Sequence, residues 1–493
     1  MRFLVYFVHR HNDFRRAEFE SVAEMCGVSN VEDLAWTRAD GGDCEETPFW
    51  YVELPDERTA RAIASRALLV KAILEAWGSA PDEGGLRDAV AAYDESRKTP
   101  YLAPGTTFKV EVEDFGVRRG SKDILKRVGD LGLPFLGKAD LKNPEHLFWS
   151  VVSDTKETPS LPQTPRHCFF GRVVGQSDRS TLKRYDLKQR SYLGPTSMDA
   201  EMALLMANFA QARPGGVILD PFCGTGSMLV AAAHYGAMTM GIDIDIRVIK
   251  HGKSARKSGS KFGVKASDGS SVDVWTNFAQ YGLQPPVALF VGDLHALPTR
   301  RFGLEGTLQG IVADPPYGVR AGGRKSGGRK PLPEDYAIPE EMRETHIPST
   351  APYPFAEMND DLMELAARFL SIGGRLTFFL PGSTEDAERE IRDLPAHPAL
   401  RLRWHSLETF NQIWGRRLVT YEKIHPYDVE VARKAREDAV AARAASDEPD
   451  LIERMRALVY DQVPAEAKRR KRYEKFHGVP PPDALTERAS AET

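Results

Sequence analysis

Residues 314–317 read Asp-Pro-Pro-Tyr and directly follow a short apolar run, residues 310–313. A nucleobase amine is a weak nucleophile because its lone pair is delocalised into the ring, and acceptors that hold its hydrogens favour a tetrahedral nitrogen. The Asp314 carboxylate and the Pro315 carbonyl are such acceptors, and Pro315 and Pro316 fix the backbone that carries them. Tyr317 offers a face on which a flipped base can stack. This order of residues predicts a site for amine chemistry, with Asp314 or water as the proton acceptor; a plain proline-rich strand exit is the alternative.

A second group of candidate residues lies in the segment 217–245, VILDPFCGTGSMLVAAAHYGAMTMGIDID. We expect a buried strand that ends at Asp220, a tight glycine-containing turn, a helix that begins near Ser227, and a second strand that ends at Asp243. The turn, which includes Pro221, has glycines that leave no side chain between the backbone and a ligand. An acid at the end of the second strand can hold a ribose diol. The segment therefore predicts a nucleoside site whose turn residues are Asp220, Pro221, Gly224 and Gly226.

The charge of this turn narrows the choice of cofactor. A dinucleotide is the less favoured alternative, because the turn lacks the third spaced glycine of that motif and carries Asp220 where a pyrophosphate would lie. A third predicted strand, VALFVGD, ends in Asp293, which is placed to border an adenine ring. S-adenosylmethionine has a sulfonium, an ammonium and an adenosine, and the three acids match these groups. We therefore expect S-adenosylmethionine as the cofactor.

The elements that must position these residues alternate between apolar runs and helical segments from residue 217 to residue 382. Such alternation is typical of an α/β, doubly wound, mostly parallel sheet of the Rossmann-like kind. Because the carboxyl ends of parallel strands meet at one edge, we expect the acids and residues 314–317 to lie close together. A helix over 195–212 precedes the sheet, with Thr196 or Ser197 as its N-cap.

Residues 1–180 predict a separate α+β region. We expect strands at 1–8, 49–55, 108–116 and 147–152, and helices at 57–78 and 121–132. The polar connector 181–190 is the candidate boundary to a second domain, residues 181–425. Residues 426–493 are charged and rich in alanine, which predicts a tail that is partly helical and partly disordered.

Composition limits the partners of the chain. Its 493 residues are 42% apolar and carry a formal charge of −4, so nucleic acid must be met by local basic patches. Four widely spaced cysteines argue against a disulfide framework or a zinc site, and we expect no metal and a reducing, cytoplasmic location. No run is long enough to span a membrane. Basic clusters that follow one another along the chain suggest a phosphate-binding track, with these candidates for RNA contact: Arg118, Arg119, Lys122, Lys126, Arg184, Lys188, Arg190, Arg320, Arg324 and Lys325.

The motifs DPFCGTGS, GIDID and DPPYG resemble those of the amino-methyltransferases, which use S-adenosylmethionine to methylate exocyclic nitrogens. The longer segments 184–210, 277–283 and 311–320 look like the tRNA guanine-N2 methyltransferases that act on guanosine 10. Residues 137–152 look like the end of a THUMP-type RNA-binding domain. The resemblance implies the catalytic subunit of a tRNA methyltransferase. It also implies that Asp220, Gly224 and Gly226 form the cofactor loop, that Asp243 binds the ribose, that Asp293 lies at the adenine end, and that residues 314–317 hold the target base.

The length of the chain resembles the eukaryotic branch of this family, whose members work with a small zinc-binding activator subunit. The resemblance therefore implies tRNA and such a subunit as partners. Two alternatives stay open. The same chemistry could act on adenine N6 or on a protein amide, or the protein could bind RNA without catalysis. Acids at all four predicted strand ends argue against the non-catalytic alternative.

Overall fold

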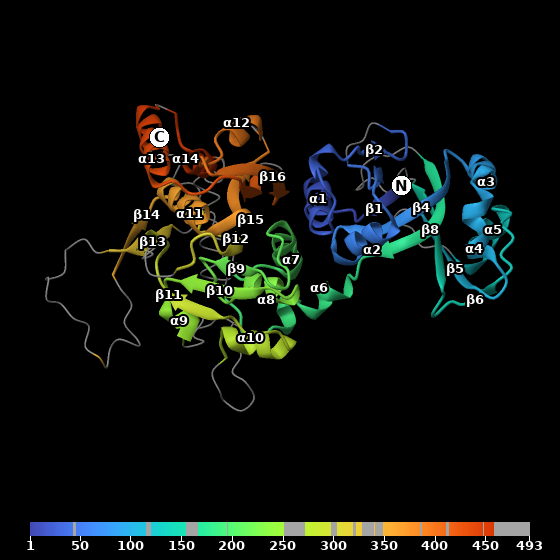
Figure 1. Cartoon of the computed structure of the whole chain (residues 1–493), viewed down its shortest axis with the longest axis horizontal. Coiled ribbons are helices and arrows are strands. Elements are labelled where there is room, and N and C mark those ends of the chain that lie inside the picture. The colour runs from blue at the N-terminus through green and yellow to red at the C-terminus, as the bar shows by residue number, and fades with distance from the viewer. Residues whose placement is uncertain are drawn as a thin grey trace, which may run out of the picture. The chain divides into compact units, whose positions relative to one another are not determined.

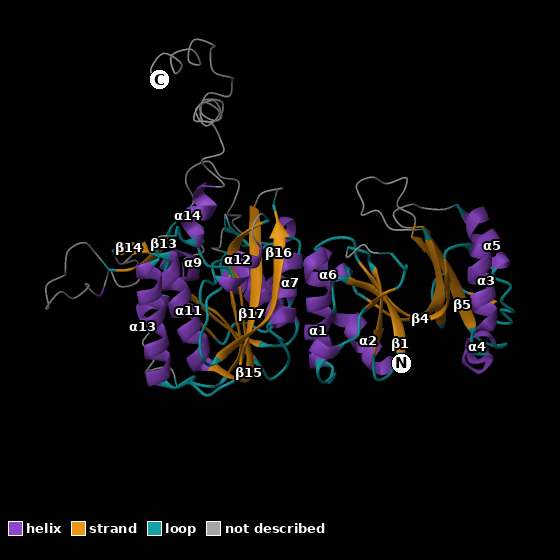
Figure 2. Ribbon diagram, turned by 90° about the horizontal axis from the view of Figure 1, so that it is seen from above, coloured by secondary structure: helices purple, strands orange, loops and turns teal. Residues whose placement is uncertain are grey.

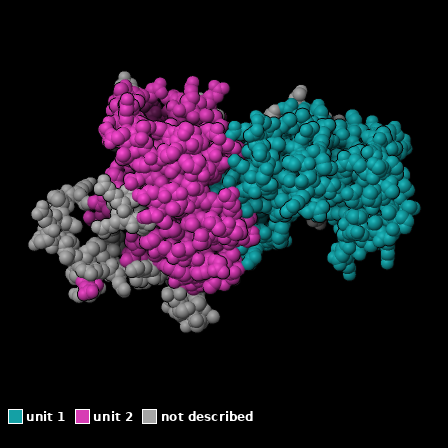
Figure 3. All heavy atoms as spheres, in the orientation of Figure 1, with its two compact units in different colours: residues 1–189, 199–211 teal, residues 190–198, 212–493 magenta. Residues whose placement is uncertain are grey.

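The computed structural model of the chain describes residues 1–42, 46–114, 120–153, 166–194, 196–250, 272–296, 303–318, 322–327, 340, 349–384, 387–410, 414–446 and 448–457. The chain forms two compact units (Figure 3). The first contains residues 1–189 and 199–211, and the second contains residues 190–198 and 212–493.

The first unit is built on an eight-stranded sheet whose strands are β1 (Arg2–Phe7), β2 (Thr37–Arg38), β3 (Phe49–Glu53), β4 (Val70–Ala80), β5 (Thr107–Asp114), β6 (Lys138–Ala139), β7 (His146–Ser153) and β8 (His167–Gln176). Their order is β2-β3-β1-β4-β8-β7-β5-β6, and only β5 pairs in parallel, with β6 and β7. The strands expected at 1–8, 49–55, 108–116 and 147–152 are confirmed as β1, β3, β5 and β7. An α+β region is therefore present, as expected.

The single helix expected over residues 57–78 is wrong in its second half. Helix α2 (Glu57–Arg66) ends there, and the chain continues as β4, which pairs with both β1 and β8. A strand between two others in a sheet covered by helices is buried on both faces and reads as a continuous apolar run, like a buried helix. The one acid in this run, Glu75, is buried and accepts hydrogen bonds from Arg172 (Nη2–Oε2, 2.8 Å) and from the Tyr93 hydroxyl (2.9 Å).

The remaining helices of the first unit are η1 (Asn12–Phe14), α1 (Arg15–Met25), η2 (Val31–Asp33), α3 (Glu83–Ala92), α4 (Glu95–Leu102), α5 (Ser121–Asp130), α6 (Ser180–Arg184), η3 (Leu187–Gln189) and α7 (Ala200–Phe209). Among them, α3 and α5 lie against the sheet, and α1 packs against α2 and α7 (Figure 1). The helix expected over 121–132 is confirmed as α5. Residues of α3, α4, β4, β7 and β8 share one apolar cluster around Trp77, which is 1% exposed.

A buried carboxylate joins helix α7 to the rest of the first unit. Glu18 on α1 accepts hydrogen bonds from the backbone N–H groups of Leu68 and Leu69 (2.8 Å each) and from the Asn208 side chain on α7 (2.7 Å). Burial raises the pKa of Glu18 to about 7. The expected N-cap of this helix is wrong, since neither Thr196 nor Ser197 caps it. Asp199 does so, by accepting from the N–H of Met202 (3.0 Å).

The second unit is built on a seven-stranded sheet of β9 (Val217–Asp220), β10 (Met238–Asp243), β11 (Ala288–Val291), β12 (Leu308–Ala313), β15 (Leu370–Ser383), β16 (Leu400–Thr409) and β17 (Trp414–Lys423). The order is β11-β10-β9-β12-β15-β17-β16. The first five strands are parallel, and β17 runs antiparallel to β15 and β16. This is the doubly wound, mostly parallel sheet that the sequence predicts. Its strand order reverses between β9 and β12, and ligands bind at such a switch point.

Helices α8 (Ser227–His234), α9 (Ile246–Lys250), α10 (Val274–Tyr281), α11 (Phe355–Phe369) and α12 (Ala387–Arg392) belong to this unit, with the short helix η4 (Leu294–Ala296) and an antiparallel pair of strands, β13 (Gly323–Ser326) and β14 (Thr350–Tyr353). The segment after residue 426 supplies α13 (Val429–Ala445) and α14 (Leu451–Arg456). Helix α13 lies along α11 (Figure 2), where Arg436 donates to Oδ1 of Asp361 at 2.7 Å. No helix in the described ranges is long and apolar enough to cross a membrane.

Candidate active site

A cavity of about 590 Å³ opens at the carboxyl ends of the parallel strands of the second unit. The β9–α8 turn, the end of β10 and the segment after β12 contribute to its wall, as do residues at the β15 and β17 ends. Of the predicted site residues, the cavity brings together Gly224, Asp243 and residues 314–317. The other predicted cofactor residues, which are Asp220, Pro221, Gly226 and Asp293, are not among its lining residues.

Asp220 ends β9 and is fully buried behind this wall. One of its oxygens, Oδ1, accepts from the backbone N–H of Phe222 at 2.9 Å. The other, Oδ2, has no hydrogen-bond partner among the described residues. Burial raises the pKa of Asp220 well above its usual value, and the carboxylates of Asp243 and Asp314 raise it further. A cation bound beside the turn would favour the ionised forms of these carboxyls, so the turn suits a cationic ligand.

The two glycines of the turn are required for different physical reasons. Gly224 has a φ of +49° and lines the cavity, and its N–H donates to Oδ2 of Asp243 at 2.9 Å. Gly226 has a φ of +82°, and a Cβ there would lie 2.9 Å from Cγ1 of Val274 on α10. Gly224 therefore allows the backbone to approach a ligand, whereas Gly226 allows α10 to pack closely behind the turn.

Asp243 ends β10 and faces the same cavity as Gly224. Its Oδ1 accepts from the N–H of Asp245 at 2.8 Å, so two backbone groups fix the carboxylate. Burial raises the pKa of Asp243. The lining residues include the hydroxyls of Thr196, Ser197 and Thr225 but no lysine or arginine from the described part of the chain. The residues present fit S-adenosylmethionine, which carries a sulfonium and an ammonium, better than a diphosphate.

Residues 314–317 follow β12 directly and stand beside the turn. The Tyr317 hydroxyl donates to Oδ1 of Asp314, and Nη1 of Arg416 lies 3.8 Å from the same oxygen. Burial raises the pKa of Asp314, while Arg416 and the Tyr317 hydrogen bond act in the opposite direction. Within the described chain both contacts fall on Oδ1, which leaves Oδ2 as an acceptor for a ligand. The same segment therefore presents an acceptor and an aromatic face.

Arg416 contacts the site through Asp314, a link that the sequence reasoning missed. It lies on β17, where its Nε donates to Oε2 of Glu408 on β16 at 2.5 Å and its guanidinium lies 4.0 Å from the ring centre of Phe379. The linear sequence shows only two adjacent arginines, and no spacing links them to Asp314. The register between β15 and β17 makes that link, and it exists only in the folded sheet.

Two aromatic residues of the cavity were also missed. Phe410 directly follows β16 and Trp414 begins β17, and their rings meet edge to face with centroids 5.1 Å apart. Phe410 is 48% exposed, which is high for a large apolar side chain. Aromatic rings at the mouth of a nucleoside-sized cavity are suited to contact with a base.

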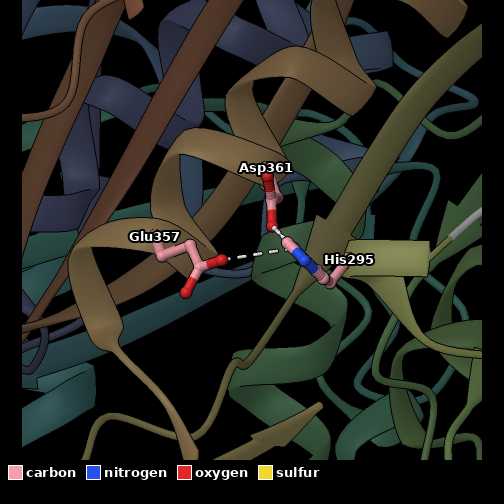
Figure 4. A group of neighbouring side chains, drawn as sticks. All are labelled: His295, Glu357 and Asp361. Carbon is pink, nitrogen blue, oxygen red and sulfur yellow. Dashed lines mark hydrogen bonds and ion pairs between the residues drawn. The ribbon is translucent and has the colours of Figure 1, made fainter. Parts of the chain in front are cut away.

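Asp293 lies two residues beyond β11 and anchors the neighbouring strand β13. Its carboxylate accepts from the backbone N–H of His295 (3.0 Å) and from that of Ser326 on β13. Next to it, Nδ1 of His295 lies 2.9 Å from Oδ2 of Asp361 and 3.4 Å from Oε1 of Glu357 (Figure 4). Both acids project from α11 toward the histidine (Figure 4).

The ligand atoms of His295, Glu357 and Asp361 lie within 4.8 Å of one another, a spacing that a metal ion could bridge. These atoms are already engaged. Glu357 pairs with Lys325, and Asp361 accepts from Arg436 and from the Tyr353 hydroxyl (2.6 Å). Two basic side chains therefore balance the two carboxylates, so we interpret the cluster as an ion-pair network that fixes β13 and α13 on α11.

The predicted RNA-contact residues have different environments. Lys122, Lys126, Arg184, Lys188 and Arg324 are exposed, whereas Lys325 is half-buried in its pair with Glu357. Arg190 is buried, and its Nη1 donates to the Ser227 hydroxyl at 2.7 Å at the start of α8. Arg118, Arg119 and Arg320 lie outside the described residues.

A doubly wound sheet with this turn, these strand-end acids and this motif defines the second unit as a Rossmann-like class I methyltransferase domain that uses S-adenosylmethionine. A sequence model described as an RMKL-like methyltransferase domain matches residues 188–330, and one described as the Tmrp11 THUMP N-terminal domain matches residues 1–179. Relatives named tRNA (guanine(10)-N(2))-methyltransferase TRMT11 are similar along most of their length. The chicken protein (Gallus gallus) is 32% identical over 86% of this chain and 88% of its own.

The human TRMT11 protein is 32% identical over 87% of this chain and 89% of its own, and that of Dictyostelium discoideum is 34% identical over 88% and 84%. The chain therefore belongs to the tRNA (guanine(10)-N(2))-methyltransferase TRMT11 family. The methyltransferase fold and the THUMP-type N-terminal domain that the sequence predicts are confirmed.

Proposed function

We propose that this protein transfers a methyl group from S-adenosylmethionine to the exocyclic N2 of guanosine 10 in tRNA. One observation carries the proposal: Asp314 and Tyr317 line the same cavity as Gly224 and Asp243. An acceptor for an amine therefore lies beside a nucleoside site, in a chain that belongs to a family of guanine-N2 methyltransferases.

Bound S-adenosylmethionine supplies an electrophilic methyl group on a positively charged sulfur. In this proposal Asp243 accepts hydrogen bonds from the ribose hydroxyls, and the Gly224 backbone allows the ligand to approach. A sulfonium bound beside the turn would favour the ionised form of the buried Asp220 carboxyl, and Pro221 fixes the turn between β9 and α8. We propose that Asp293 lies at the adenine end of the site, because it follows β11, which pairs with β10.

The target guanine is held by residues 314–317. Oδ2 of Asp314 and the carbonyl of Pro315 accept from the two amine hydrogens, which favours a tetrahedral nitrogen with a localised lone pair. Pro316 holds the backbone in register, and Tyr317 stacks on the ring. The nitrogen then forms the new N–C bond as the S–CH₃ bond breaks, S-adenosylhomocysteine leaves, and one proton passes to Asp314 or to water.

For tRNA we propose contact with the exposed members of the basic set, together with the candidates that lie outside the described residues. Exposed cations gain affinity by releasing counterions from phosphates. We assign Arg190 to support of the β9–α8 turn, because its buried guanidinium already binds the Ser227 hydroxyl. Lys325 contributes through the position of β13, where it pairs with Glu357.

We further propose that the protein acts in the cytoplasm as a heterodimer with a small zinc-binding activator subunit. The edge strand β11 is a suitable surface. Among the described strands it pairs with β10 alone. Its last residue, Val291, is 41% exposed, and Val287, which directly precedes the strand, is 64% exposed. An apolar edge with open backbone groups favours pairing with another chain.

The test is to incubate the protein, with and without the activator subunit, with labelled S-adenosylmethionine and an unmodified tRNA transcript, and to map the labelled nucleoside. The proposal expects N2-methylguanosine at position 10 and no label in a tRNA that carries inosine there, because inosine lacks the N2 amine. Asp314→Ala is the matched inactive variant. Labelled N6-methyladenosine, labelled protein, or tight tRNA binding without transfer in both conditions would reject the proposal.

A further inference from the structure

The C-terminal helix α14 lies against the segment that carries the amine-binding residues. Two apolar side chains of this helix, Ile452 and Met455, are 6% and 0% exposed. They form one cluster with Tyr317 and Trp414, both of which also line the cavity. Neither Ile452 nor Met455 is among the lining residues of the cavity, so α14 packs behind its wall rather than inside it.

A polar contact fixes the same helix to the end of the motif. The guanidinium of Arg456 donates to the carbonyl oxygen of Gly318 through Nη2 (2.8 Å) and through Nε (3.3 Å). Gly318 directly follows Tyr317 and has a φ of +79°, and a Cβ there would lie 3.8 Å from Cγ2 of Ile452. The backbone just after the aromatic residue is therefore held by a charge-assisted bond to α14.

The helix itself is anchored at its start. Asp450 and Glu453 form a capping box, in which Asp450 accepts from the N–H of Glu453 at 2.7 Å. Arg454 donates to Oδ2 of Asp393 near α12 at 2.8 Å, and Glu448, just before the helix, pairs with Arg389 on α12. With both ends of α14 attached, Arg456 and Met455 have a defined position relative to the motif.

We infer that α14 is a positioning element for methyl transfer, and that Arg456, Met455 and Ile452 fix the rotation of the Tyr317 ring and the backbone of residues 314–318 against the target base. Tyr317 is bonded to Asp314, so a displaced ring also displaces the acceptor. A shift of about 1 Å in such a group lowers turnover strongly even when binding is preserved. The inference rests on the function proposed above and adds residues from the C-terminal segment to it.

Four variants test this role, in the full-length protein with its activator subunit. Arg456→Ala removes the bond to Gly318. Arg456→Lys retains a cationic side chain that can donate one hydrogen bond to the Gly318 carbonyl. Met455→Ala loosens the packing on Tyr317. Arg433→Ala on α13 is the matched control, because it removes an exposed arginine whose ion pairs among the described residues are with acids of its own helix, Glu430 and Glu437. The measurements are kcat for tRNA, calorimetric affinity for S-adenosylhomocysteine, the melting temperature, and hydrogen exchange of a peptide covering residues 311–318.

The inference expects kcat to fall about tenfold in Arg456→Ala and Met455→Ala and to recover in Arg456→Lys. Affinity for S-adenosylhomocysteine should stay within about twofold, and residues 311–318 should exchange faster. Unchanged kcat in both variants would overturn it, as would a fall in kcat that is accompanied by equal losses of cofactor affinity and melting temperature. If the wild-type protein methylates no tRNA, the proposed function fails, and hydrogen exchange alone decides. Faster exchange in Arg456→Ala than in Arg433→Ala supports the positioning role, and equal exchange rejects it.

Discussion

The phenol of Tyr317 donates its hydrogen to Oδ1 of Asp314, three residues earlier in the chain. Arg416 approaches the same oxygen from β17, with Nη1 at 3.8 Å. Stacking surface and amine acceptor are thus one hydrogen-bonded unit, and a cation from the antiparallel end of the sheet balances its charge.

Tyr317→Phe should lower kcat about tenfold while the KM for tRNA changes little, because the ring remains and only the hydrogen bond to a charged group is lost. Tyr317→Ala should in addition raise the KM for tRNA, since base stacking contributes about 1–3 kcal/mol. Steady-state methylation of one tRNA transcript by both variants distinguishes the two effects. Equal losses in kcat and KM for both variants would show that the hydroxyl has no role of its own.

Arg416→Gln should shift the acidic limb of the kcat–pH profile to higher pH. The ionised Asp314 carboxylate is the stronger acceptor for the amine hydrogens and the form that can take up the proton. Its raised pKa therefore places the loss of activity above the ordinary value of about 4. Removing the cation disfavours the ionised form and raises the pKa further. Glu408→Gln removes a charge of the opposite sign and should shift the limb to lower pH. The assignment of the limb to Asp314 fails if both variants shift it in the same direction.

The sequence predicted the parts of the site that are local. Strand, turn and motif adjoin one another in residues 217–245 and 310–317, so their order along the chain already implies a common sheet edge. The helical cap at Thr196 or Ser197 failed for a local reason, because three polar residues compete there and only Asp199 lies at the right place.

The rest of the site depends on contacts between distant segments. Arg416 reaches Asp314 through the register of β17, and Arg456 reaches Gly318 across more than a hundred residues. The wrong helix over 57–78 has the same origin. Glu75 looks like a solvent-facing helical residue until its partner Arg172 is known. The periodicity of a single sequence does not show which distant residues become partners in the fold.

Asp243→Asn and Asp314→Ala should affect different steps. Asp243→Asn should weaken S-adenosylhomocysteine binding about tenfold or more, because the loss of its charge weakens a fixed acceptor for the ribose. Asp314→Ala should lower kcat about 100-fold or more with nearly unchanged cofactor affinity, since it removes an acceptor that acts on the amine. Isothermal calorimetry and single-turnover methylation measure the two quantities separately. Collapse of cofactor affinity in Asp314→Ala would reject its assignment to the amine.

Lys122→Ala and Lys126→Ala on the exposed face of α5 should weaken tRNA binding by similar factors for different tRNAs. Each lost phosphate contact should reduce the slope of log K against log salt by about 1. Arg87→Ala is the control, because Arg87 is an exposed cation on α3 of the same unit. Filter binding at several salt concentrations measures the slope. An unchanged slope in the double variant would place the RNA contact elsewhere.

Glu18 should make the first unit less stable as pH rises from about 4.5 to 7. Its pKa is raised to about 7 in the folded state, so the unfolded chain releases its proton first, and stability falls by up to ~3 kcal/mol across this window. Glu18→Gln removes this dependence but also loses a bond to Leu68 or Leu69, so it should be less stable than wild type at pH 5. The difference between the two proteins should therefore narrow by pH 8. Hydrogen exchange of β4 peptides, compared at the same pH, measures this difference in stability. Glu53→Gln is the control, because Glu53 is exposed. A difference that stays constant from pH 5 to pH 8 would mean that Glu18 is ionised throughout, held by its three hydrogen-bond donors.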